Sequence, residues 1–117
     1  MRWWRKAAEQ GDTSAQEELA TAYFWGNGVQ ADHSEAARWF RKAAEQGEIF
    51  AQTSLAYLYA RGEGVPKDLA LAHMWLNLAA AQGQPVAKIG LGRLASKMTS
   101  GQISEARRLS RGWKPTK

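Results

Sequence analysis

The chain has 117 residues, enough for one domain with a single modest core, and 44% of them are apolar and 23% charged, which excludes a disordered chain. There is no cysteine, so a disulfide framework, a thiolate nucleophile and a thiolate metal site are excluded. The net charge is +5, but residues 88–117 carry eight Lys or Arg against one acid, so the basic character belongs to the C-terminal end.

The N-terminal stretch MRWWRKAAEQ lacks the apolar run of a signal peptide, and no apolar stretch reaches the length of a membrane span. Ala is abundant and β-branched residues are scarce, which favours helices over strands. We therefore expect a soluble, cytoplasmic, helical protein with no membrane contact.

An internal repeat organises the chain. RWWRKAAEQG at 2–11 returns as RWFRKAAEQG at 38–47, and residues 2–37 match residues 38–73 at 19 of 36 positions. A third copy begins at Trp75 and loses the pattern after Leu91. The sequence thus predicts tandem copies of one structural unit.

Residues 1–11 align with the second helix of a unit, because Trp3 falls at the repeat position of Trp39 and Trp75. Either the chain is cut from a longer array, or this N-terminal edge needs another cover. Stacking two chains edge to edge would cover it, so self-association is a further hypothesis. The residues expected at that uncovered edge are Trp3, Trp4, Ala7 and Ala8.

Residues 12–47 and 48–83 each predict a pair of helices. Ala51, Leu55, Leu58 and Tyr59 share one face of a first helix, and Ala36, Trp39, Phe40 and Ala43 share one face of a second. Gly26 and Gly62 are placed to end the first helices, and Gly11, Gly47 and Gly83 to end the second ones. Asp32 and Asp68 are placed to cap the second helices, with His33 in the turn beside Asp32.

Residues 84–98 predict the first helix of a degenerate repeat, and residues 99–113 a closing helix followed by a tail at 114–117. Thr99 and Gln102 have capping-box spacing, and Ile103, Ala106, Leu109 and Trp113 share one side. The other side is basic, which suits the polar outer face of a terminal helix. An alternative function is binding of nucleic acid or another polyanion by Arg107, Arg108, Arg111 and Lys114, although nucleic acid is not the expected partner.

Two helices of this length cannot bury their apolar stripes alone, whereas stacked copies can. The predicted fold is therefore all-α: one domain, residues 1–117, forming an α-solenoid of antiparallel helix pairs with a C-terminal capping helix. The expected core residues are Leu19, Tyr23, Trp39, Leu55, Tyr59 and Trp75.

The pattern A-x-x-x-L-A-x-x-Y-x-x-G-x-G-V-x-x-D-x-x-x-A, followed by W-F-R-K-A-A-x-x-G, resembles the SLR family (Sel-one-like repeats), relatives of the tetratricopeptide repeats. The resemblance covers residues 1–92, with Leu78 where Lys is usual. It implies an adaptor or scaffold that assembles protein complexes through surface positions that vary between repeats. Some exported members carry a Cys pair in each unit, which this chain lacks.

The first helices of such units line the concave side, so their residues opposite Leu19 are candidates for binding a peptide or protein. Trp, Tyr and Arg dominate binding energies at interfaces, which favours the aromatic and basic members of this set. The alternative is that Phe24 and Trp25 pack against the neighbouring unit or the glycine turn. The predicted partner-binding residues are Glu17, Thr21, Phe24, Trp25, Tyr57, Arg61 and Arg93.

Catalytic chemistry is not predicted. His33 and His73 occupy neither equivalent repeat positions nor a metal-binding spacing, and we expect them to be solvated or partly packed. G-N-G-V and G-E-G-V recur at one repeat position, as turns do and a unique phosphate-binding loop does not. We expect neither a cofactor nor a bound metal.

Overall fold

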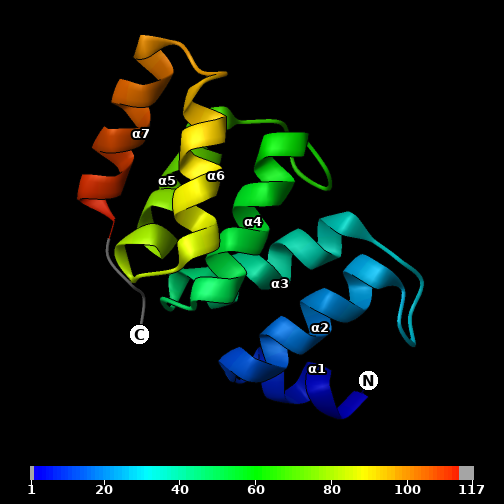
Figure 1. Ribbon diagram of the computed structural model, residues 1–117. Coiled ribbons are helices and arrows are strands. Elements are labelled where there is room, and N and C mark those ends of the chain that lie inside the picture. Colours follow the sequence, from blue (N-terminus) through cyan, green and yellow to red (C-terminus); the bar gives the residue numbers. More distant parts are fainter. Residues whose placement is uncertain (1, 114–117) are drawn as a thin grey trace.

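A computed structural model describes residues 2–113, with side chains from Arg5 onward. Helices follow one another from α1 at one end to α7 at the other, over a longest dimension of 44 Å (Figure 1). Within the described residues there is no strand, so the all-α prediction is confirmed. The helices are α1 (Arg2–Glu9), α2 (Thr13–Trp25), α3 (His33–Glu45), α4 (Ile49–Arg61), α5 (Leu69–Ala81), α6 (Pro85–Ala95) and α7 (Ser100–Gly112).

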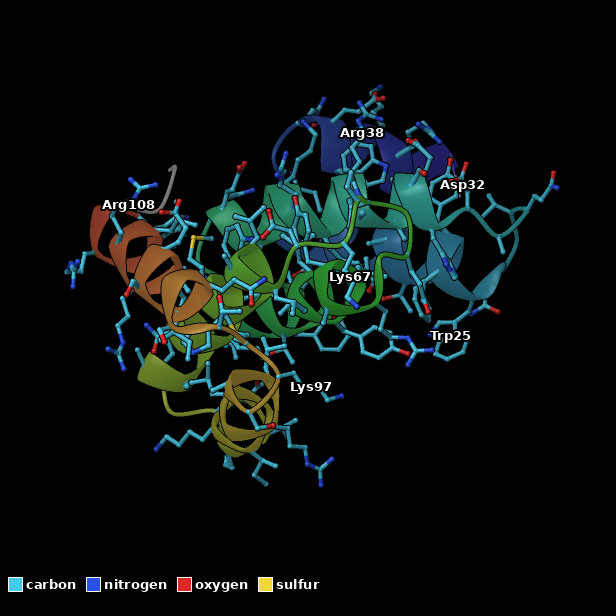
Figure 2. The ribbon with its side chains drawn as sticks, turned by 90° about the horizontal axis from the view of Figure 1, so that it is seen from above. Trp25, Asp32, Arg38, Lys67, Lys97 and Arg108 are labelled. Atoms are coloured by element: carbon cyan, nitrogen blue, oxygen red, sulfur yellow. The ribbon has the colours of Figure 1, made fainter. Side chains whose placement is uncertain are left out.

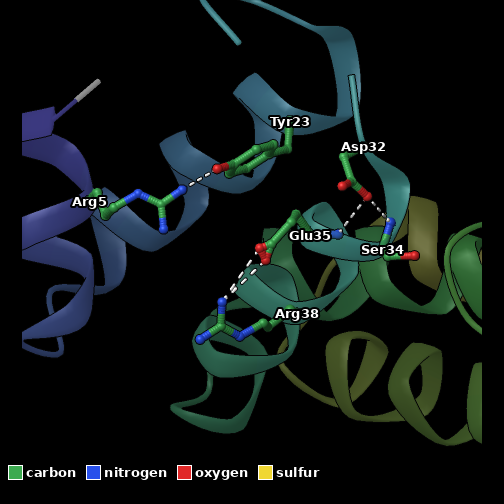
Figure 3. A network of polar contacts seen from close by, with 6 residues as sticks. All are labelled: Arg5, Tyr23, Asp32, Ser34, Glu35 and Arg38. Carbon is green, nitrogen blue, oxygen red and sulfur yellow. Dashed lines mark hydrogen bonds and ion pairs between the residues drawn. The ribbon is translucent and has the colours of Figure 1, made fainter. Parts of the chain in front are cut away.

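The helix ends follow local chemistry. Gly26 and Gly62 end α2 and α4 in the left-handed region, at φ 75° and 68°, where a Cβ would be strained. The Asp32 carboxylate accepts hydrogen bonds from the backbone amides of Ser34 and Glu35, as Figure 3 shows. One expectation is wrong: His33 is the first residue of α3 and not part of the turn, because the cap on Asp32 starts the helix directly after it.

The helices form two layers, the first helices of the repeats (α2, α4 and α6) and the second helices (α1, α3 and α5), and the core lies between them. Leu19 and Leu55 are completely buried, and Trp39, Tyr59 and Trp75 are at most 5% exposed. Burying a large apolar side chain contributes roughly 1.5 to 3 kcal/mol, so these repeated positions carry much of the stability. Tyr23 is half-buried and packs against the same cluster.

Buried glutamines connect successive units. Gln16 in α2 donates to the carbonyl of Ala8 in α1, and Gln52 in α4 donates to the carbonyl of Ala44 in α3, at 3.0 and 3.2 Å. Each amide oxygen then accepts a hydrogen bond from a glutamine at the end of the second helix of its own unit. Because buried polar groups must be paired, these bonds fix how far each first helix slides along the preceding second helix.

A second repeated bond joins the layers. Arg5 donates to the hydroxyl of Tyr23, and Arg41 to the hydroxyl of Tyr59 (Figure 3 shows the first pair). In the third unit both partners are replaced, by Asn77 and Ala95. Because the arginine and the tyrosine are replaced together, no arginine is left there without its tyrosine partner.

The terminal helix α7 does not form a hairpin with α6. It packs along α5 instead, where the rings of Trp75 and Trp113 meet edge to face with centroids 5.8 Å apart. Thr99 and Gln102 form the expected capping box, and Ala106 is completely buried. The closing helix therefore covers α5, the last of the second helices, and does not pack along α6.

The N-terminal edge differs from expectation at Ala8. Ala8 is 1% exposed, because α2 packs over it, and Ala7 packs against the core as well. The side chains of Trp3 and Trp4 lie outside the described ones. The uncovered apolar edge that the sequence predicted is thus absent at Ala8, whereas Ala7 is partly buried.

Candidate partner-binding surface

The first helices α2, α4 and α6 share one face of the molecule, here called the first-helix face, and it is hollowed in three adjoining places. Trp25 and Lys97 project on this side, away from Arg38 on the opposite side (Figure 2). The largest depression, the central hollow, has a volume of about 470 Å³. It is lined by Thr21, Phe24, Trp25, Phe40, Phe50, Thr53, Ser54, Tyr57, Leu58, Gln84 and Val86.

Large apolar side chains stand exposed around the central hollow. Trp25 is 68% exposed, Val86 65%, Phe50 54% and Tyr57 47%, although soluble proteins seldom leave such side chains together in water. Phe24 lies beneath them, with its ring 4.8 Å from that of Trp25 and 6.5 Å from that of Tyr57, both in edge contacts. These rings form an apolar floor and rim with free contact area.

Phe24 also has a packing partner inside its own unit. Its ring is stacked on the imidazole of His33 at 4.7 Å and 14°, a contact that the helical wheel did not predict. His33 Nδ1 lies 3.7 Å from the carboxylate of Glu63 in the next unit. Part of the burial of Phe24 is therefore structural, whereas Trp25 keeps most of its surface in solvent.

Arg61 lies beside the hollows and not in them. Its guanidinium is 5.1 Å from the ring centroid of Tyr57, and its Nε donates to Glu63 at 2.8 Å. The ion pair with Glu63 raises the pKa of Arg61 further. Arg61 thus pairs with Glu63 and lies against the Tyr57 ring. The sequence had indicated it as a partner-binding residue, but it lines none of the three hollows.

Beside the central hollow, at its α2 end, lies the acidic hollow, which has a volume of about 430 Å³. It is lined by Ser14, Glu17, Glu18, Thr21, Ala22, Asn27 and Phe50, two of which, Thr21 and Phe50, also line the central hollow. Burial raises the pKa of Glu17, the nearby charge of Glu48 raises it further, and the Ala51 amide lowers it. One carboxylate oxygen of Glu17 is buried without a hydrogen-bond partner.

At the opposite, α6, end lies the basic hollow, which has a volume of about 270 Å³. Thr53, Tyr57 and Val86 line it together with the central hollow, and Arg93 and Lys97 add two cations. Within residues 2–113 neither cation has an ion-pair partner. The first-helix face therefore runs from acidic through apolar to basic.

The structure brings together in these hollows six of the seven residues that the sequence indicated, all but Arg61. Phe50 and Val86 were missed. Both fall in the first turn of a first helix, at the repeat position of Ser14, and an apolar residue recurring there in two successive units was the available signal. A wheel at 100° per residue places this repeat position about 140° from Leu19, as far round as Phe24, so the same wheel could have assigned it to the first-helix face.

Other candidate chemistry lies elsewhere. His73 lies on α5 and is buried, and this burial together with the charge of Arg107 lowers its pKa. Arg107, Arg108 and Arg111 are exposed on α7, with Arg108 paired to Glu105, and Lys114 lies outside the described residues. Among the described side chains, no group of three His, Asp or Glu is placed to hold a metal ion. No helix in residues 2–113 is long and apolar enough to cross a membrane.

The Sel1 repeat family matches residues 1–12, 13–48 and 49–84, which is more than half of the chain. The chain belongs to the Sel1 repeat family. Repeats of this kind generally mediate contacts between proteins and are generally not catalytic. The first two complete Sel1 repeats thus supply α2 to α5, and the hollows lie across their first helices and α6.

Several solved structures share this fold, among them the following two. A protective antigen of uropathogenic Escherichia coli strains, c5321, displays an SLR fold and superposes with a TM-score of 0.89 at 37% identity over 94% of this chain. A Sel1 repeat protein from Oxalobacter formigenes gives 0.78 at 46% identity over 80%. The chain spans about a quarter of the length of each, 24% and 27%. No curated protein matches it.

Proposed function

We propose that this chain's Sel1 repeats act as a non-catalytic adaptor that binds an extended segment of a protein partner across the first-helix face. The observation that carries the proposal is the apolar central hollow, with Trp25, Tyr57 and Phe50 about half or more exposed around it. Contiguous apolar surface of this kind on a soluble domain marks sites of protein interaction. The general role of Sel1 repeats in protein contacts supports the same function.

The residue types suit this role. Trp and Tyr contribute most to binding energy at protein interfaces, since each offers a large rigid surface at a small entropic cost. Trp25 and Tyr57 come from different repeats and meet at Phe24, so a bound segment would contact α2 and α4 together. The backbone of the platform is held by the stacked core and needs no rearrangement to present these rings.

The test selects peptide ligands from a random display library on the immobilised protein, then measures the affinity of the synthesised peptides. We expect Trp25→Ala with Tyr57→Ala to weaken binding by roughly tenfold or more, because truncating such residues typically costs above about 1 kcal/mol each. Ile89→Ala is the matched control, since Ile89 is 59% exposed on α6 but lines none of the three hollows. Equal binding by the double variant, with helicity retained, would refute the proposal.

A further inference from the structure

The charges at the two ends of the first-helix face are not neutralised by the protein. Ion pairs lie elsewhere on the surface, between Glu35 and Arg38 and between Glu105 and Arg108. Within the described residues, Glu18 in the acidic hollow has no ion-pair partner, and the same holds for Arg93 and Lys97 in the basic hollow. Opposite charges therefore stand at the two ends of the face with their interactions unused.

The order of the three hollows is fixed by the side chains that they share. Thr21 and Phe50 join the acidic hollow to the central one, and Tyr57 and Val86 join the central hollow to the basic one. A ligand lying across α2, α4 and α6 consequently meets negative charge, then apolar surface, then positive charge. An extended peptide of about six to eight residues reaches roughly 20 to 26 Å at about 3.3 Å per residue, a length suited to three adjoining hollows.

We propose that the first-helix face selects a protein segment with a basic side chain for the acidic hollow, apolar side chains for the central hollow and an acidic side chain for the basic hollow. This inference rests on the proposed function and adds the chemistry of its partner. The apolar centre supplies most of the affinity, whereas the charged ends supply register and selectivity, since exposed ion pairs contribute little energy but discriminate against like charge.

The partner's charge pattern separates this selection from simple attraction to a basic protein. The whole chain has a net charge of +5, so long-range attraction alone favours an acidic ligand. Selection by the two charged hollows instead favours a ligand with opposite charges at its ends and no net charge. The two accounts therefore rank the same peptides differently.

The experiment uses three labelled peptides of about eight residues with the same apolar centre, including one phenylalanine. One has lysines at one end and glutamates at the other, one has glutamates at both ends, and one has lysines at both. Binding is measured by fluorescence anisotropy at low and high salt. We expect the mixed-charge peptide to bind about threefold or more tightly than either other peptide at low salt, with the preference shrinking as salt screens the charges.

Charge reversal assigns the preference to the basic hollow. In Arg93→Glu with Lys97→Glu both ends of the face are acidic, so the peptide with lysines at both ends should become the tightest ligand. Arg107→Glu with Arg111→Glu is the matched control, because it makes the same charge change on α7, away from the hollows. This control should keep the preference for the mixed-charge peptide.

The other outcomes distinguish a failure of the charge selection from a failure of the proposed function. Equal binding of all three peptides that is lost in the Trp25→Ala, Tyr57→Ala variant overturns the charge selection and leaves the proposed function standing. An equal shift of preference in the α7 control overturns the inference in favour of long-range attraction. Binding of none of the peptides counts against both the inference and the proposed function.

Discussion

The side-chain amide of Gln82 donates a hydrogen bond to the amide oxygen of Gln52, 3.0 Å away, and the same bond joins Gln46 to Gln16 one repeat earlier. Each buried acceptor is itself fixed by the bond that it donates to a carbonyl of the preceding helix. Three successive helices are therefore connected through one side chain. Such a bond pattern sets the register of stacked units in a way that apolar packing alone does not.

Replacing Gln52 with Leu should destabilise the protein by roughly 1 to 3 kcal/mol, because the carbonyl of Ala44 and the amide of Gln82 then lose their partner. Gln82→Ala should cost less, since Gln82 is exposed and water can replace it at Gln52. Urea unfolding of both variants checks this order. A Gln52→Leu variant as stable as the wild type would show that the hydrogen bonds of Gln52 contribute no stability.

Gly28 and Gly64 occupy the same repeat position and have nearly the same positive φ, 79° and 76°. A Cβ at Gly28 meets nothing within 4 Å, whereas one at Gly64 would collide with the backbone of His33 and Ser34. Gly28→Ala should therefore cost roughly 1 to 2 kcal/mol from the left-handed backbone alone. Gly64→Ala should cost roughly 1 to 3 kcal/mol more, because the loop must move away from α3.

Thermal unfolding of the two glycine variants, side by side, measures that difference. Because the backbone strain is common to both, the excess cost at Gly64 isolates the packing of one repeat's loop on the preceding unit. Equal losses in the two variants would mean that the loop moves away without cost.

The helices and their ends could be predicted because they depend on local chemistry. Gly26 and Gly62 end helices and Asp32 and Asp68 cap them through interactions with residues close in sequence. The repeat then indicated which faces meet, since only a stack buries the same stripe in every copy. The Sel1 repeat family and the all-α fold followed from that pattern.

The position of α7 depends on contacts without a repeat counterpart. The sequence showed that α7 has an apolar side. It did not show that this side packs against α5 instead of α6. Phe50 and Val86 were missed for another reason: the first complete unit has Ser14 at their repeat position, so a wheel drawn on that unit shows no apolar residue there. The short-range stacking of His33 on Phe24 likewise follows from the exact start of α3.

Glu17 should destabilise the protein when it is ionised. Its pKa is raised above 4.5 by burial and by Glu48, so the folded state holds the proton more tightly than the unfolded state does. The free energy of unfolding therefore decreases as the pH rises from about 4.5 through the folded pKa. Glu17→Gln should raise the Tm at pH 7 and leave it nearly unchanged at pH 3.5; a lower Tm at pH 7 would contradict this assignment.

His73 should give the opposite dependence on pH. Burial, and then the charge of Arg107, hold its pKa below the ordinary 6.5, and its Nδ1 has no hydrogen-bond partner. Between the folded pKa and 6.5 the unfolded state binds more protons than the folded state. The free energy of unfolding should therefore fall as the pH drops below about 6.5, and the dependence ends once the pH is below the folded pKa.

Urea unfolding at a series of pH values between about 7.5 and 5 measures this slope. His73→Leu removes the titrating group and should abolish the slope whatever its effect on stability at neutral pH, while Arg107→Ala should only reduce it, because burial is the larger cause. The comparison of slopes separates titration from packing, since a change in packing shifts stability equally at every pH. A slope unchanged in His73→Leu would assign the acid sensitivity to another group and leave α7 packed on α5 independently of pH.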